Sequence, residues 1–161
     1  MGREDWYRNT DWNPEIATQF LAKLKRASNK GEYLRIQAYC LTKSHPEDAL
    51  TLLERYLSMP DAFDRTSAYV QQAEAFLTLG EIDKALASYE LALAREREHP
   101  NILTQAYLDL PFLVATMGRR ERYSRAVDIL TQNRARPMFP NERFRWNAAS
   151  ALICEGLGDR S

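Results

Sequence analysis

Histidine and cysteine, the residues that most often serve as nucleophiles or metal ligands, are scarce and widely separated in this chain of 161 residues. Both histidines, His45 and His99, directly precede a proline, in segments typical of turns. The two cysteines, Cys40 and Cys154, lie in apolar stretches of helical periodicity. A zinc site needs such ligands at short spacing, and a cysteine nucleophile needs a histidine within reach. The sequence therefore predicts no metal site and no cysteine–histidine pair.

Other catalytic patterns are also missing from the sequence. It contains no glycine-rich phosphate loop and no nucleophile elbow. Acidic pairs such as Glu81 with Asp83, and Glu96 with Glu98, alternate with bases on expected outer helix faces and are interpreted as solvated. We therefore expect no catalytic residues and no cofactor, and a protein that acts by binding rather than as an enzyme.

Positive charge is concentrated in one segment, although the whole chain has 22 basic and 22 acidic residues. Residues 119–145 hold three acids and eight arginines: Arg119, Arg120, Arg122, Arg125, Arg134, Arg136, Arg143 and Arg145. The first four form a candidate strip for an acidic partner. The alternative is that they are surface arginines in the connections between helices. Aromatic residues do not alternate regularly with them, which disfavours nucleic-acid binding.

The composition is that of a globular domain, with 45% hydrophobic and 27% charged residues. No apolar run approaches the ~20 residues that a membrane span needs. The first residues lack the apolar core of a signal peptide. The two distant cysteines fit a reducing compartment. We therefore expect a single cytoplasmic domain that does not interact with membranes.

Helix start and stop signals divide the chain into about eight helices. Asn13-Pro14-Glu15 combines a capping residue, a first-turn proline and an acid at a helix start. Pro111 should break or kink the helix in which it falls. No segment shows the alternation of a strand, so the expected class is all-α. The expected elements are an aromatic arm at 1–13, a leading helix at 14–30, hairpins at 32–58, 64–98 and 101–134, and an unpaired helix at 140–158.

The two-helix unit recurs along the chain. The second helix of each hairpin begins near an alanine, Ala49, Ala85 or Ala126, with separations of 36 and 41 residues. The middle hairpin has the fullest pattern: Tyr69-x2-Gln72-Ala73-x2-Phe76, then Gly80, then Ala85-x3-Tyr89-x2-Ala92. This pattern, with the turn at residues 79–85, resembles the tetratricopeptide repeat (TPR) family over about residues 32–159. Gln37 and Val114 replace the small residue in the neighbouring hairpins.

The resemblance implies a right-handed superhelical stack of antiparallel helical hairpins, a TPR-like α-solenoid. It also implies a scaffold that binds a helical or extended apolar peptide of a protein partner in a concave groove. The implied groove residues are Leu34, Ala38, Leu41, Val70, Gln71, Glu74, Leu77, Ala115, Ala148, Leu152 and Glu155. The basic set with which some relatives hold a peptide carboxylate is absent, since Leu34, Ala38, Val70 and Glu74 stand in comparable places. Alternatively, the leading helix or the Trp6-Tyr7 arm fills the groove.

Two functions remain open at this point. One is a scaffold within a larger assembly of bacterial type, and the other is a small TPR-type secretion chaperone that holds an unfolded client segment. The last helix has apolar residues that no following helix covers. We therefore expect either that the natural chain continues with a capping helix or that a homodimer forms through Ala149, Leu152 and Ile153. In that dimer Arg143 and Arg145 would lie at the rim.

Overall fold

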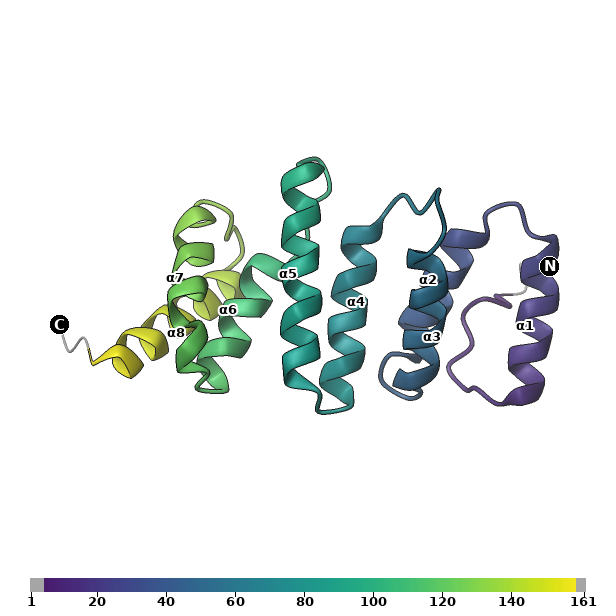
Figure 1. Ribbon diagram of the computed structural model, residues 1–161, viewed down its shortest axis with the longest axis horizontal. Coiled ribbons are helices and arrows are strands. Elements are labelled where there is room, and N and C mark those ends of the chain that lie inside the picture. Colours follow the sequence, from purple (N-terminus) through teal and green to yellow (C-terminus); the bar gives the residue numbers. More distant parts are fainter. Residues whose placement is uncertain (1–4, 159–161) are drawn as a thin grey trace. The chain divides into compact units, whose positions relative to one another are not determined.

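The computed structural model describes residues 5–158, and within this range the chain is helical and contains no strand (Figure 1). The all-α class is confirmed. The eight α-helices of the described range are α1 (Pro14–Arg26), α2 (Lys30–Leu41), α3 (Pro46–Leu57), α4 (Arg65–Thr78), α5 (Ile82–Glu98), α6 (Ala106–Thr116), α7 (Tyr123–Gln132) and α8 (Pro140–Leu157). A short 3-10 helix, Arg120–Arg122, leads into α7. The chain divides into two compact units, one ending at Ile102 and the other beginning at Leu103.

In the first unit each helix packs mainly on the next one in the chain. The closest pair is α4 and α5, which run antiparallel (Figure 1). Ala73, Ala85 and Ala92 have no exposed surface there. Because these side chains are small, the two helix backbones can approach closely. Gly80 joins the helices with a φ of 75°, a left-handed conformation that suits glycine at a helix end.

An aromatic arm, residues 5–13, packs against α1 and α2. The Trp6 ring lies 5.5 Å from that of Phe20 and 5.0 Å from that of Tyr33. The Tyr7 ring lies 4.5 Å from that of Tyr33. Asn9 donates two hydrogen bonds to the Gln37 side-chain oxygen, from its backbone N–H at 3.0 Å and its amide at 2.8 Å. The arm therefore extends the core of the first unit.

In the second unit α6 packs on both α7 and α8. Its buried side chains include Tyr107, Leu108 and Leu110. Polar contacts supplement this apolar packing: Arg145 Nη2 lies 2.7 Å from Asp109 Oδ1. The Arg136 guanidinium lies 3.9 Å from the centre of the Tyr107 ring. Charged groups therefore hold α8 and its preceding loop to α6.

In this region the expected helix start at residue 101 is wrong, and so is a break at Pro111, which was one of the two alternatives expected there. The helix expected from residue 101 begins at Ala106, after a turn in which Ile102 N–H bonds to the His99 carbonyl. Pro111 does not break α6, which continues through it. Because α6 starts late, Pro111 lies only in its second turn, where its missing N–H removes a single helical bond.

Candidate functional site

The first unit has a pocket of about 520 Å³ between α2 and α4. One wall comes from the end of α2 and the turn that follows it, and the other from the last turns of α4. The residues that line it are Tyr39, Cys40, Thr42, Lys43, Glu74, Leu77 and Thr78. The pocket thus lies between the first helices of two consecutive hairpins.

The lining of this α2–α4 pocket combines apolar and charged groups. Tyr39 is 60% exposed, and Leu77 is half-buried. Lys43 and Glu74 place opposite charges on the two walls. Burial raises the pKa of the Cys40 thiol, so that it stays protonated at neutral pH and acts as a small apolar surface rather than a nucleophile. The arrangement can bind a side chain or a peptide, but it holds no activated group.

Two of the predicted groove residues, Glu74 and Leu77, line this pocket, but the groove residues predicted on α2 do not. Leu34, Ala38 and Leu41 are buried in the core of the first unit, together with Phe20 and Leu24 of α1. The leading helix and the aromatic arm cover this face of α2. Successive residues of a helix point about 100° apart, so the neighbours Tyr39, Cys40 and Thr42 line the pocket instead.

The remaining predicted groove residues do not form one surface within either unit. On α4, Val70 is half-buried and Gln71 is only 9% exposed. In the second unit Ala115 is buried, and it cannot contact a partner in this conformation. The groove residues predicted on α8 differ in exposure: Ala148 is half-buried, while Leu152 and Glu155 are exposed.

The predicted dimer contact on α8 is incorrect in two of its three residues. Ala149 and Ile153 have no exposed surface, because they pack within the second unit. Leu152 is 40% exposed and Leu157 is also exposed. One side of the last helix is therefore covered by α6 and α7 of the preceding hairpin.

The arginines of residues 119–145 do not behave as one group. Arg119 lies 4.0 Å from Glu121, and Arg120 is exposed. Arg122 and Arg125 are half-buried beside the start of α7. Of the other four, Arg136 and Arg145 are engaged in the packing of the second unit, whereas Arg134 and Arg143 line a separate pocket.

Among residues 5–158 no group of three or more histidine, cysteine, aspartate or glutamate side chains could hold a metal ion. No helix in the same range is long and apolar enough to cross a membrane. Comparison with protein-family models, with curated proteins and with solved structures finds no match to this chain.

Proposed function

We propose that this chain is a non-catalytic interaction protein with a TPR-like solenoid architecture, and that it binds a peptide of another protein in the α2–α4 pocket. The observation that supports this function is the pocket itself, between the first helices of two consecutive hairpins. In helical-repeat proteins, such faces are extended binding surfaces. Two free thiols, Cys40 and Cys154, agree with a cytoplasmic location.

The pocket chemistry suggests what the peptide contributes. An apolar side chain would pack against Leu77 and the exposed Tyr39 ring, and Lys43 and Glu74 would bond to polar groups at either side. Fully burying one aliphatic side chain contributes about 1.5–3 kcal/mol. Affinity from this pocket alone is therefore modest, and a tight complex requires further contacts along the helices.

The alternative, a secretion-type chaperone, is supported by a different observation. Several large apolar side chains are strongly exposed, including Phe63, Met138 and Phe144. Exposed apolar side chains can shield an unfolded client segment. A chaperone should bind a denatured client better than a folded one, whereas a scaffold should bind a preformed motif.

The test begins with co-purification from the native host and mass spectrometry, followed by affinity measurements with the partner identified. Leu77→Glu and Tyr39→Ala should each weaken binding at least tenfold, because they remove the apolar contacts of the pocket. Leu91→Glu is the matched control, since Leu91 is exposed on α5 and does not line the pocket. Circular dichroism must show that the variants fold. Normal binding by folded Leu77→Glu and Tyr39→Ala variants would refute the site.

A further inference from the structure

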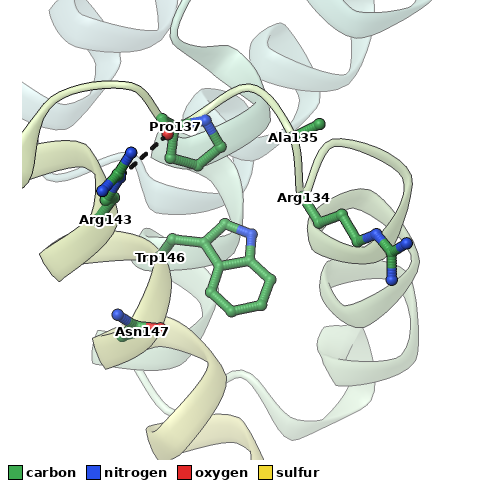
Figure 2. Close-up of a pocket in the computed structure, with 6 residues that line it drawn as sticks. All are labelled: Arg134, Ala135, Pro137, Arg143, Trp146 and Asn147. Carbon is green, nitrogen blue, oxygen red and sulfur yellow. Dashed lines mark hydrogen bonds between the residues drawn. The ribbon is translucent and has the colours of Figure 1, made fainter.

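A second pocket, of about 400 Å³, lies in the second unit between α8 and the loop that precedes it (Figure 2). The loop contributes Arg134, Ala135 and Pro137. The helix contributes Arg143, Trp146 and Asn147. Arginine is thus the only charged residue type among the described residues that line this basic–aromatic pocket.

The half-buried Trp146 ring forms the centre of the pocket. Its Nε1–H donates to the Leu130 carbonyl at 3.4 Å, which holds the indole against α7. Arg143 Nε donates to the Pro137 carbonyl at 3.5 Å. Figure 2 shows the side chains of Arg143 and Arg134 on opposite sides of the indole. The pocket therefore presents an aromatic surface flanked by two positive charges.

The neighbouring charged residues explain why these two arginines are available. Arg136 is turned to the start of α6: it donates to the carbonyl of Thr104, just before the helix, at 2.8 Å and covers the Tyr107 ring. The nearest acid in sequence, Glu142, accepts the backbone N–H of Met138 at 2.8 Å and bonds to Gln105. Neither side chain is among the described residues that line the pocket. Its positive charge is thus not neutralised by its own lining.

Exposed apolar side chains adjoin this pocket along the chain. Met138 and Phe139 directly follow Pro137, and Phe144 directly follows Arg143; all three are strongly exposed. Exposed apolar area rimmed by polar groups marks a surface that binds other proteins where it forms a contiguous patch. Arginine pairs with carboxylates through two parallel hydrogen bonds, which gives such contacts directional specificity.

We propose that the basic–aromatic pocket binds an extended acidic segment of a partner protein, with an apolar side chain between acidic ones. The apolar side chain packs on Trp146, and carboxylates on either side of it pair with Arg134 and Arg143. A protein segment fits better than a nucleic acid, because the described residues place a single aromatic ring and two exposed arginines in the lining, whereas strand binding uses successive stacking rings. This site is separate from the α2–α4 pocket and does not depend on it.

The test uses the full chain and a synthetic peptide of sequence Gly-Asp-Asp-Leu-Asp-Asp-Gly with blocked ends. The readout is the indole N–H resonance of Trp146, which Trp146→Phe distinguishes from those of Trp6 and Trp12. The peptide should shift the Trp146 signal in a saturable manner. Arg134→Gln and Arg143→Gln should each raise the apparent Kd at least fivefold, and added salt should raise it as well. Arg120→Gln is the matched control and should leave the Kd unchanged.

Three results would overturn the proposal. Equal affinity for a peptide with asparagine in place of aspartate would show that the carboxylates contribute nothing to binding. A loss of binding in Arg120→Gln as large as in Arg134→Gln would place the acidic segment on the strip at residues 119–125. A shift of the Trp146 signal by an oligothymidylate but not by the peptide would make the ligand a nucleic acid. Leu77→Glu should not change peptide binding here, which separates this test from that of the α2–α4 pocket.

Discussion

The α4–α5 hairpin of the first unit and the α6–α7 hairpin of the second share a turn but differ in how their helices pack. Gly80 and Gly118 both have positive φ. At both turns the glycine N–H donates to the carbonyl three residues before it, and the next N–H donates to the carbonyl five residues before itself. However, the residue twelve positions before the alanine of the second helix (Ala85 or Ala126) lies at different distances from the glycine: it is Ala73, seven residues before Gly80, and Val114, only four residues before Gly118. Neither has any exposed surface. The difference of three residues corresponds to the 3-10 helix Arg120–Arg122, which lies between this turn and α7.

The two units supplement their apolar packing with polar contacts of different kinds. In the first unit, alanines such as Ala73 and Ala85 line the crossing of α4 with α5. In the second, α6 is also held to α8 by the Arg145–Asp109 ion pair. Across α4 and α5 the polar contact is neutral, since the Ser88 hydroxyl donates to the Gln72 side-chain oxygen at 3.0 Å, whereas α6 and α8 share a charged pair. Substitutions at Ala73 and Val114 should therefore lower the free energy of unfolding for different reasons in the two hairpins.

The largest effect is expected at the two helix crossings. Ala73→Leu should lower the free energy of unfolding by up to ~3 kcal/mol, because the close crossing has no space for a larger side chain. Val114→Ala should lower it by about 2 kcal/mol, since it removes buried carbons and leaves a cavity. Urea denaturation measures both, with Ala87→Leu at an exposed position of α5 as control. Stabilisation by Val114→Ala would show that α6 needs a small residue just as α4 does.

The ion pair of the second unit should have the next largest effect. Arg145→Leu leaves the mostly buried Asp109 carboxylate without its partner, at a cost of about 1–2 kcal/mol at neutral pH. Burial raises the pKa of Asp109 above its ordinary value of 3.8, and the hydrogen bond and charge of Arg145 oppose this rise. Removing Arg145 should therefore raise the pKa of Asp109 further.

The pH dependence of stability tests this assignment. A carboxyl group whose pKa is higher in the folded than in the unfolded state binds more protons when the chain is folded. The stability that it contributes therefore falls as pH rises through the folded pKa. Arg145→Leu should therefore lose stability more steeply than the wild type as the pH rises from about 4. Asp109→Asn combined with Arg145→Leu should remove this extra slope. An unchanged slope in the double variant would assign it to another group.

Sequence alone predicted the local elements better than the contacts between them. Asn13-Pro14 begins α1, and the Asn13 side chain accepts the Ile16 N–H at 2.9 Å as expected of a cap. The start of α6 was misplaced because Thr104, rather than the segment after Pro100, precedes the helix and accepts the Ala106 N–H. A capping signal involves only a few neighbouring residues. Sequence alone therefore locates the start of a helix where a single capping residue is available, and misplaces it where there are two.

The face of α2 could not be predicted in the same way, because the arm that covers it is distant in sequence. One signal did exist: Gln37 stands where the repeat has a small residue, and a buried amide needs hydrogen-bond partners. Asn9 supplies them, and it also accepts from Gln37 Nε2 through its backbone carbonyl at 2.7 Å. The basic–aromatic pocket was missed as well, because its arginines become distinct from Arg136 only through their tertiary contacts.

The smallest effect is expected at the start of α8, where Glu142 replaces the side-chain cap that Asn13 gives α1. Its carboxylate accepts the backbone N–H groups of Met138 and Phe139, and these bonds lower the pKa of Glu142 below its ordinary value of 4.5. A lowered pKa means that the stabilisation is present at neutral pH and is lost as pH falls through the folded pKa. Glu142→Gln should therefore slightly lower the thermal midpoint at pH 7, and the difference should shrink in acid. Glu121→Gln, at an exposed position, is the control. A deficit of Glu142→Gln that stayed constant into acid would mean that the carboxylate charge does not stabilise this helix start.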